Sequence, residues 1–381
     1  MDLFGDLPEP TQSPTPVSTT SLQITKEKES ETKTLKRKRD AEEEEERSQT
    51  KVCKEGLPVL KGYVAARRGG AMRCRMLTCC CLTWALVWLL SRTMCKSRMA
   101  DGRTDVQPEL VSTLLTFPVL YRCRVSYFAV FDGHGGARAS QFAAENLHQI
   151  LAKKFPVRET ENVDGLIRKC LLDTFRQTDE DFLKKASSQK PAWKDGSTVT
   201  CLLAVDDVVY VANLGDSRAV LCRMESSGAG GGQKPVTLAL SKEHNPTIYE
   251  ERMRIQKAGG TVRDGRVLGV LEVSRSIGDG QYKRCGVIST PDLRRCRLTA
   301  NDRFIILACD GLFKVFSADE AVKFVLSVLQ EATVVQRTGL VEAELTEEEL
   351  RYDAACQQLA SEAVRRGCAD NVTVILVSLG Y

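Results

Sequence analysis

Three aspartates stand beside apolar, β-rich segments, where their carboxylates could meet. Asp132 follows FAVF, Asp310 follows FIILAC, and Asp370 comes shortly before VTVILV. A buried strand that ends at an aspartate places the carboxylate at the edge of its sheet, so three such ends can converge. Carboxylates gathered in this way need a cation, and hard oxygen ligands favour Mg²⁺ or Mn²⁺ over zinc. A single aspartate here would be an ordinary turn former, but the shared position of all three favours a metal site.

The elements that must position these aspartates can be read from the spacing of apolar residues. Continuous or alternating apolar runs predict strands, at 125–131, 197–205, 208–214, 217–223, 303–309 and 371–379. Apolar residues three and four apart predict helices, at 137–155, 163–186, 249–258, 317–329 and 349–367. Tight turns between adjacent strands favour antiparallel pairing. We therefore expect an α+β fold of two antiparallel β-sheets packed as a sandwich, with helices on both outer faces in four αββα layers.

Composition excludes several classes of protein. The chain has 381 residues and a net charge of only +4, so coating nucleic acid is not its main task. It has only 3 histidines, which nearly excludes a multi-histidine metal site. It has 15 cysteines, an odd number, and it opens with MDLFGDLPEP rather than with a secretory signal. We expect free thiols in a reducing compartment, a monomer, and no binding to nucleic acid.

Residues 1–55 are predicted to be a disordered, charged tail. The segment combines a Ser/Thr/Pro-rich stretch with blocks of acidic and basic residues, and it cannot bury enough apolar area to offset the entropy of ordering. Its basic cluster Lys36–Arg39 is either a nuclear import signal or a solvated charge run beside Glu42–Glu46. We expect a cytoplasmic protein, and the first interpretation adds the nucleus.

Six motifs in order carry a family resemblance. They are FAVFDGHGG at 128–136, DGST at 195–198, VANLGDSRAVL at 211–221, RVLGVLEVSRSIGD at 266–279, FIILACDGLFKV at 304–315 and ADNVTVILV at 369–377. With them the chain resembles the metal-dependent serine/threonine protein phosphatases of type 2C. The resemblance implies two Mg²⁺ or Mn²⁺ ions and hydrolysis of phosphoserine and phosphothreonine by a metal-activated hydroxide. It also implies phosphoprotein substrates and an integrin-linked kinase among the partners.

The same resemblance implies roles for individual residues. Asp132 would bridge both ions, the carbonyl of Gly133 would bind one, and Asp310 and Asp370 would hold the other. Asp195 would contribute to a third, weaker ion. His134 would be the general acid that protonates the leaving alkoxide, although a histidine in this loop could also simply cap the following helix. The loop at 213–218 lacks a lysine and a strand-to-helix context, so we interpret it as a hairpin turn rather than a phosphate loop.

The chain departs from the family at 72–124. Residues 56–71 resemble the start of the catalytic domain and 125–381 its remainder, but the family's Arg-x-x-Met-Glu/Gln-Asp motif is missing between them. This motif supplies a phosphate-binding arginine and acidic metal ligands, so the phosphate-binding residue is unknown here. Arg67 and Arg68 have no Met-x-Asp after them, and we do not transfer the role to them. We expect 72–121 to be poorly structured, which would leave a sheet edge unpaired.

Two interpretations of the atypical segment differ in their consequences. The apolar run 76–90 could be a membrane anchor, but it is shorter than the roughly 20 residues that a bilayer needs. Alternatively, permitted codons for Met72–Cys81 read in a shifted frame encode Glu-Met-Gln-Asp-Ala-His-Val-Leu-Leu, and the two codons before them can encode Arg-Asp. This restores the missing motif, so we favour a frameshift. As written, the chain would be an impaired phosphatase or a binding scaffold.

Overall fold

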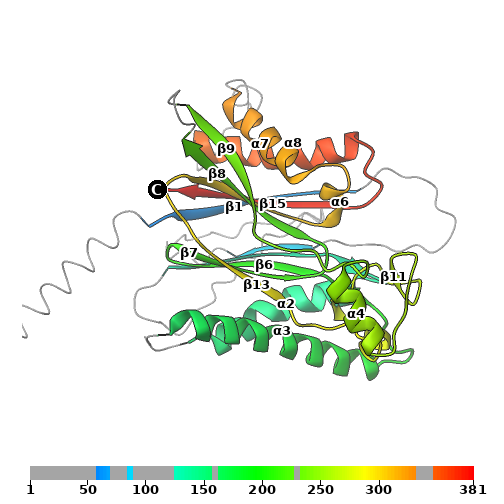
Figure 1. The fold of residues 1–381 in the computed structure, drawn as a ribbon. Coiled ribbons are helices and arrows are strands. Elements are labelled where there is room, and N and C mark those ends of the chain that lie inside the picture. Colours follow the sequence, from blue (N-terminus) through cyan, green and yellow to red (C-terminus); the bar gives the residue numbers. More distant parts are fainter. Residues whose placement is uncertain (1–56, 69–83, 89–123, 157–161, 227–231, 332–345) are drawn as a thin grey trace, which may run out of the picture. The chain divides into compact units, whose positions relative to one another are not determined.

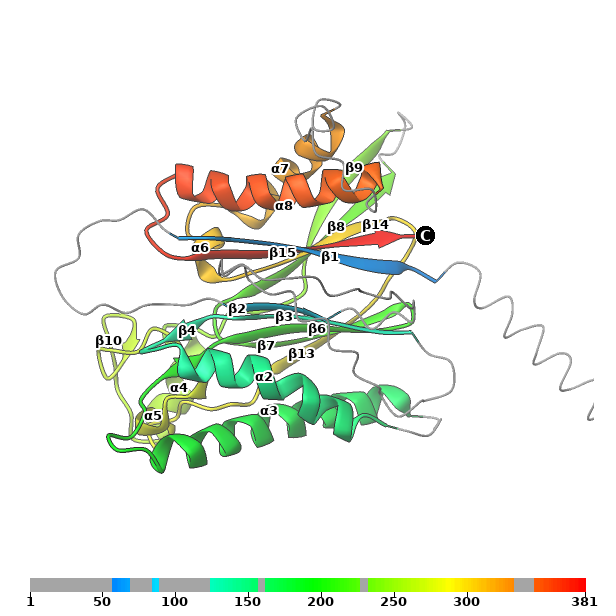
Figure 2. The ribbon, with the colours of Figure 1, turned by 180° about the vertical axis from the view of Figure 1, so that it is seen from behind.

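Two antiparallel β-sheets lie face to face between two pairs of helices (Figures 1 and 2). The structure is a computed structural model, and it describes residues 57–68, 84–88, 124–156, 162–226, 232–331 and 346–381; of 84–88 only the backbone is described. Pro58–Tyr381 form one compact unit. The predicted four-layer αββα fold is confirmed.

Each sheet has five strands within the described ranges. The first sheet has the order β13-β7-β6-β3-β2, with bounds Asp292–Arg297, Val208–Leu214, Val199–Val205, Val125–Phe131 and Trp84–Trp88. The second has the order β1-β15-β14-β8-β9, with bounds Val59–Arg67, Val372–Gly380, Asp302–Ala308, Arg218–Ser226 and Gln233–Ala239. All neighbouring strands pair antiparallel. The six apolar runs predicted as strands all lie in these sheets.

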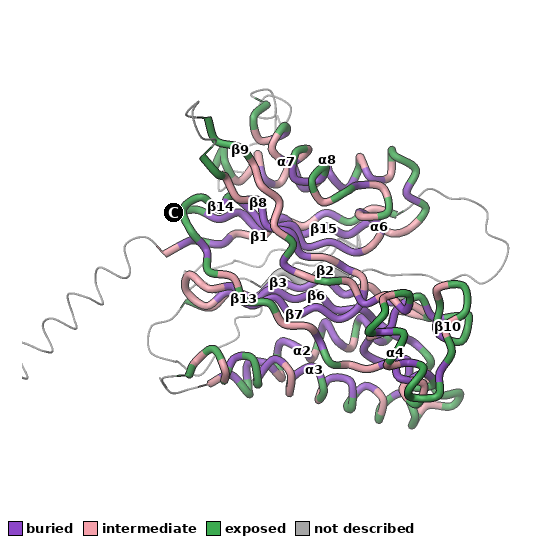
Figure 3. The backbone as a smooth tube through the Cα atoms, in the orientation of Figure 1, coloured by how far each residue is buried: buried purple, intermediate pink, exposed green. Residues whose placement is uncertain are grey.

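The helices cover the outer faces of the sandwich. Helices α2 (Arg138–Lys154) and α3 (Val163–Ser187) pack on the first sheet, and α7 (Ala318–Gln330) and α8 (Glu347–Arg365) pack on the second. A capping box starts α7 at Ser317, where the sequence predicts a helix start. The helices bury the stripe that faces the sheet and expose the opposite side (Figure 3), as amphipathic helices do.

A third apolar cluster fills the space between the sheets. Phe128 and Leu202 from the first sheet meet Ile305 and Ile375 from the second, and all four side chains are fully buried. Strands β3, β6, β14 and β15 are therefore apolar on both faces, which explains why their sequences read as continuous apolar runs. This core fixes the two sheets against each other and so brings their strand ends together.

Shorter elements lie at one end of the sandwich. A small three-stranded sheet joins β12 (Ile277–Gly278), β5 (Gly196–Ser197) and β4 (Gly133–His134). A segment that follows β9 contains α4 (Tyr249–Lys257), β10 (Val262–Arg263), β11 (Arg266–Val267) and α5 (Gly280–Lys283). Helix α6 (Asp310–Phe313) directly follows β14.

One expectation about the atypical segment is wrong. Residues 84–88 are not unpaired: they form β2, which pairs antiparallel with β3 from Trp84 opposite Phe131 to Trp88 opposite Tyr127. The five residues are all apolar, so they suit a position beside the buried β3. The edge of the first sheet is therefore occupied. The rest of 72–124 lies outside the described residues, except for Arg124, and so does the predicted tail.

The structure bears on two further expectations. The eight cysteines within the described ranges are all free thiols, as the sequence analysis expects. No helix in the described part of the chain is long and apolar enough to cross a membrane. In addition, β2 takes five residues of the run 76–90 into a sheet, so these five do not belong to a membrane helix.

His148 lies buried on the inner face of α2, and its Nδ1 is 2.9 Å from the carbonyl oxygen of Ala144. Burial lowers the pKa of His148 to about 4. As the pH falls below about 6.5, His148 of the unfolded chain binds a proton that the folded chain does not bind until about pH 4. The free energy of unfolding therefore decreases as the pH falls through this window.

The wild-type protein loses stability when the pH is lowered from 7.5 to 4.5. We predict that His148→Leu loses roughly 2 kcal/mol less over the same range, because it lacks the titrating group. Urea unfolding of both proteins at the two pH values measures the difference. Because other groups also titrate, the variant is compared with the wild type at each pH rather than with itself. An identical loss in both proteins contradicts the prediction.

Candidate metal centre and active site

The predicted aspartates come together at one end of the sandwich. Asp132 follows β3, Asp310 follows β14, and Asp370 comes shortly before β15. Strand β14 ends where its antiparallel partner β15 begins, and β3 contacts both strands across the core. Oxygen atoms of Asp132 and Asp310 and the Sγ of Cys309 all lie within 4.8 Å of one another. The strand ends thus converge as the sequence predicts.

A fourth aspartate belongs to this cluster. Asp216 follows β7, and β7 runs parallel to β3 because both pair antiparallel with β6. Burial and then the charge of Asp310 raise the pKa of Asp216 to about 7. The sequence interpretation of 213–218 as a hairpin turn is wrong, because β7 and β8 lie in different sheets and the loop between them crosses from one sheet to the other. It also missed this side chain. The signal was present, because Asp216 follows a buried strand just as Asp132 and Asp310 do.

Electrostatics indicate that the cluster is built for a cation. Burial raises the pKa of Asp132 well above its usual value, and the carboxylates of Asp310, Asp216 and Asp370 raise it further. Such crowding is unfavourable unless positive charge is present. The Oδ1 atom of Asp310 is buried and has no hydrogen-bond partner among the described residues, although buried carboxylate oxygens normally have one. An orphaned oxygen facing other carboxylates fits a metal ligand.

The donor set favours a hard cation. Cys309 is fully buried, and its thiol donates to the carbonyl of Asn371 at 3.3 Å and accepts from the amide of Thr373 at 3.2 Å. Burial and the charge of Asp132 raise the pKa of Cys309 well above its usual value. The thiol is therefore neutral and occupied. The remaining donors are carboxylate oxygens, which suit Mg²⁺ or Mn²⁺.

His134 is held next to this cluster by a residue that the sequence analysis did not single out. Its Nε2 lies 2.6 Å from Oδ2 of Asp279, which also accepts from the hydroxyl of Ser276 at 2.6 Å. Burial lowers the pKa of His134, but the charge and hydrogen bond of Asp279 outweigh it and raise the pKa above its usual value. This geometry favours a protonated imidazole, the form that a general acid needs.

Two backbone features allow the pair to form. Asp279 has a φ of 51°, an uncommon left-handed conformation that is found preferentially at functional sites. Gly196 packs so closely that an added Cβ would collide with Asp279 Oδ2 and with His134 Nε2. The glycine of the DGST motif is therefore explained by the space that the pair requires.

Two other predicted ligands, Gly133 and Asp195, are not among the residues whose ligand atoms cluster around Asp132 and Asp310. Gly133 lies in β4, and a Cβ there would collide with Ser140 of α2, so only glycine fits. Asp195 accepts from the amide of Arg138 at 3.0 Å, and its other oxygen lies 3.3 Å from the guanidinium of Arg138. Both of its oxygens thus face the start of α2. Asp195 is not part of the group formed by Asp132, Cys309 and Asp310, and its role at a third ion stays a prediction.

Asp370 meets Asp310 through a lysine. The Nζ atom of Lys314 lies 2.5 Å from Oδ2 of Asp310 and 2.7 Å from Oδ2 of Asp370. Burial lowers the pKa of Lys314, but its hydrogen bonds to Asp310 and Asp370 outweigh this and raise the pKa above its usual value. The lysine is charged. Lys314 therefore binds Asp310 and Asp370, the two carboxylates that the family resemblance assigns as ligands of the same metal ion.

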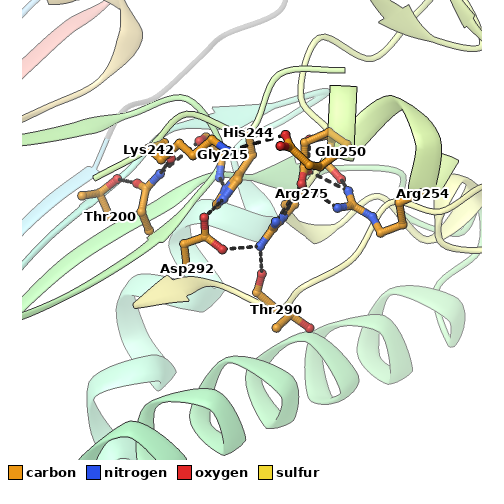
Figure 4. A network of polar contacts seen from close by, with 12 residues as sticks. Thr200, Gly215, Lys242, His244, Glu250, Arg254, Arg275, Thr290 and Asp292 are labelled. Carbon is orange, nitrogen blue, oxygen red and sulfur yellow. Dashed lines mark hydrogen bonds and ion pairs between the residues drawn. The ribbon is translucent and has the colours of Figure 1, made fainter. Parts of the chain in front are cut away.

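His244 supports the loop that carries Asp216. Its ring Nδ1 accepts from the amide of Gly215 at 3.1 Å, and its Nε2 lies 3.1 Å from Asp292 (Figure 4). Burial and the charge of Arg275 lower the pKa of His244, so the ring is neutral and Nδ1 can accept. His244 therefore has a structural role: its ring contacts the Gly215 loop.

An ion-pair network anchors the segment between β9 and β13. Glu251 of α4 binds Arg254 at 2.7 Å and Arg275 at 2.7 Å. Arg275 also binds Asp292 at 2.9 Å, a contact that Figure 4 shows. The hydrogen bonds from the two arginines outweigh burial and hold the pKa of Glu251 far below its usual value. The segment is thereby fixed to β13 and to His244, so it can form a stable wall beside the metal cluster.

A cavity of about 410 Å³ lies between this segment and the metal cluster. Asp216, Asp310 and Lys314 line its side toward the cluster, and Asp264 and Arg266 of the β10–β11 turn line the other. The cavity is polar and large enough to admit a phosphorylated side chain. It adjoins the cluster, which places any bound group next to the carboxylates.

The arginines before the atypical segment do not supply the missing phosphate contact. The guanidinium of Arg67 donates to Gln357 at 2.8 Å and to Ser361 at 3.2 Å, both on α8. It holds β1 to the outer helix layer. This agrees with leaving the role unassigned. The segment expected to carry the missing motif lies outside the described residues.

Comparison with known proteins identifies the family. The model of the family described as protein phosphatase 2C matches residues 95–372. An integrin-linked kinase-associated serine/threonine phosphatase 2C of Bos taurus is 53% identical over 405 aligned positions that cover 100% of both chains. The protein of that name from Homo sapiens is 56% identical over 340, covering 87% of this chain and 76% of its own.

A solved structure agrees on the fold. A sex-determining protein of C. elegans has a TM-score of 0.58 and 22% sequence identity, covering 84% of this chain and 64% of its own. At this identity the likeness concerns the sandwich alone. The match of the family model across most of the sequence and the identity to the curated relatives carry the assignment further. The chain therefore belongs to the protein phosphatase 2C family.

Proposed function

We propose that this member of the family hydrolyses phosphoserine and phosphothreonine in proteins with two Mg²⁺ or Mn²⁺ ions. Asp132 would contact both ions, the carbonyl of Gly133 one of them, and Asp310 and Asp370 the other. The observation that supports this set most strongly is the convergence of carboxylates at one end of the sandwich, where Oδ1 of Asp310 is buried and has no hydrogen-bond partner among the described residues. Family membership makes the chain a protein serine/threonine phosphatase.

The chemistry divides between the ions and the protein. Bound divalent ions neutralise phosphoryl charge and lower the pKa of water. The carboxylate of Asp132, at the end of β3, would hold the ions at the place where the reaction occurs. Asp279 holds Nε2 of His134, which leaves Nδ1 to protonate the departing serine or threonine oxygen. The wall formed by the 242–290 segment keeps the substrate beside these groups.

A metal titration on phosphopeptides tests the proposal. The expected result is hydrolysis of phosphoserine and phosphothreonine peptides that rises with Mn²⁺ or Mg²⁺ and disappears in excess chelator. Unchanged turnover in excess chelator contradicts it. The comparisons give no support to the scaffold or membrane-tethered alternatives. If the chain binds phosphopeptides without turnover at saturating metal, the scaffold interpretation replaces the enzyme.

We predict that Asp279→Asn lowers kcat at least tenfold with little change in KM. The amide keeps the size of the side chain but removes the charge that favours protonated His134, and a positioned general acid is worth about 10²–10⁴ in rate. Steady-state kinetics on a phosphopeptide measures the two constants. Asp207→Asn, which removes a surface ion pair with Arg297, is the control. Equal kcat in wild type and Asp279→Asn contradicts the role of Asp279.

We also propose the partner and the location. The curated relatives are named for their association with an integrin-linked kinase, and such a kinase or its phosphorylated neighbours would suit this enzyme as partner and substrate. A cytoplasmic location, with nuclear import through Lys36–Arg39, follows from the sequence pattern. A third, weaker ion has Asp195 as its predicted ligand, and Asp216 is a further oxygen donor near the cluster.

A further inference from the structure

Lys314 occupies an unusual position for a cationic side chain. It ends the short helix α6, one turn after Asp310, and its backbone amide donates to the Asp310 carbonyl at 2.8 Å. The side chain folds back along this turn. Its ammonium then lies between Asp310 and Asp370, at 2.5 and 2.7 Å from one oxygen of each.

The two oxygens of Asp310 have different environments. Oδ1 is buried and has no hydrogen-bond partner within the described ranges. Oδ2 is bound by Lys314, and so is Oδ2 of Asp370. Among the described residues, Oδ1 of Asp310 therefore has no cationic partner, while the site between Asp310 and Asp370 already holds an ammonium.

A divalent ion and the ammonium cannot share these oxygens. Mg²⁺ needs its ligands at about 2.0–2.1 Å in near-octahedral geometry, and an ion bound by both Oδ2 atoms would occupy the place where Nζ now lies. Even beside it, two cations so close would repel each other strongly, because both are partly shielded from water. Lys314 must leave before an ion binds at this pair.

We propose that Lys314 is a tethered cation that competes with the second metal ion for Asp310 and Asp370. The inference rests on the metal set given under the proposed function. Its consequence is two classes of metal affinity: the ion that Asp132 and the carbonyl of Gly133 would hold binds tightly, and the ion that Asp310 and Asp370 would hold binds weakly. The lysine also keeps the two carboxylates together in the metal-free protein.

Direct metal binding to the full chain tests the competition without measuring turnover. Mn²⁺ is titrated into the chelator-treated protein, and free Mn²⁺ is counted by electron paramagnetic resonance. Lys314→Met keeps most of the side-chain volume and removes the charge, and we expect it to lower the dissociation constant of the weaker ion at least tenfold. Lys314→Arg keeps the charge and should leave that ion weak. Lys323→Met, an exposed lysine of α7, is the matched control.

Thermal unfolding gives a second readout. Without metal, Lys314→Met should unfold at a lower temperature than the wild type, because Asp310 and Asp370 then lose their counter-charge. With saturating Mn²⁺ the gap should close or reverse. Weaker or unchanged Mn²⁺ binding in Lys314→Met, in a variant that unfolds cooperatively, overturns the proposal. If Lys314→Met does not fold, Lys314→Gln is measured against the same expectation.

The outcomes separate this proposal from the proposed function. A wild type that binds no Mn²⁺ contradicts the proposed metal centre itself. A wild type that binds two ions and turns over substrate, but whose weaker ion is indifferent to Lys314, contradicts only the competition. Tighter binding in Lys314→Met without any turnover supports the competition and contradicts the enzyme.

Discussion

Asp132→Asn is expected to lower kcat/KM on a phosphopeptide by at least a thousandfold. Asp132 is the partly exposed carboxylate at the centre of the cluster, and an amide binds a hard divalent ion much more weakly than a carboxylate does. Metal ions supply both the charge neutralisation and the activated water of such a hydrolysis, so little else can compensate. Kinetics at a series of Mn²⁺ concentrations separates lost affinity from lost turnover.

The same variant should not damage the fold. The pKa of Asp132 is raised by burial and by neighbouring carboxylates, so the charged form is disfavoured in the metal-free protein. A neutral amide removes this repulsion, and the metal-free variant should unfold at the wild-type temperature or above it. Asp173→Asn, on the outer side of α3, is the control for activity. Near-normal turnover in Asp132→Asn refutes the two-metal assignment.

Restoring the N-terminal motif is expected to have the second largest effect. A chain that carries Arg-Asp-Glu-Met-Gln-Asp at the start of 72–124 should exceed the present chain about ten- to a hundredfold in kcat/KM. The arginine adds a charge-assisted, bidentate contact to phosphate, and such a bond is worth roughly 1.5–3 kcal/mol. The acidic residues add metal ligands, so the Mn²⁺ concentration at half activity should fall as well.

The comparison requires both chains side by side. Sequencing the transcript across codons 60–125 first shows which of them the cell makes. A restored chain with its motif arginine changed to alanine serves as the control, because it keeps the acidic residues and loses only the phosphate contact. Equal efficiency and equal metal dependence in the two chains would show that the motif is dispensable here.

The sequence predicted the inner strands because they are buried on both faces. Strands β3, β6, β14 and β15 have continuous apolar runs. Such a run predicts a buried strand from the local sequence alone, without knowledge of the neighbouring strands. The strands β1, β9 and β13 were not predicted, since they lie at sheet edges and mix charged with apolar residues. Strand β1 owes its existence to nine paired positions on β15, a partner more than 300 residues away.

The site shows the same division. Asp132 and Asp310 were found because each follows an inner strand. Asp279 escaped notice because its importance lies in one contact to His134, 145 residues earlier in the chain, and no local pattern records such a contact. Lys314 was missed for another reason: a lysine after DGLF reads as a surface residue until Asp370 is seen beside it.

Strand β15 has a consequence for how the enzyme is made. It lies between β1 and β14 in the second sheet, and it is synthesised after every other described strand. Until it emerges from the ribosome, β1 lacks its partner strand, β14 pairs only with β8, and Asp370 has no strand to hold it. We therefore expect a nascent chain that already carries Asp132 and His134 to be inactive until β15 has been made and has paired with β1 and β14.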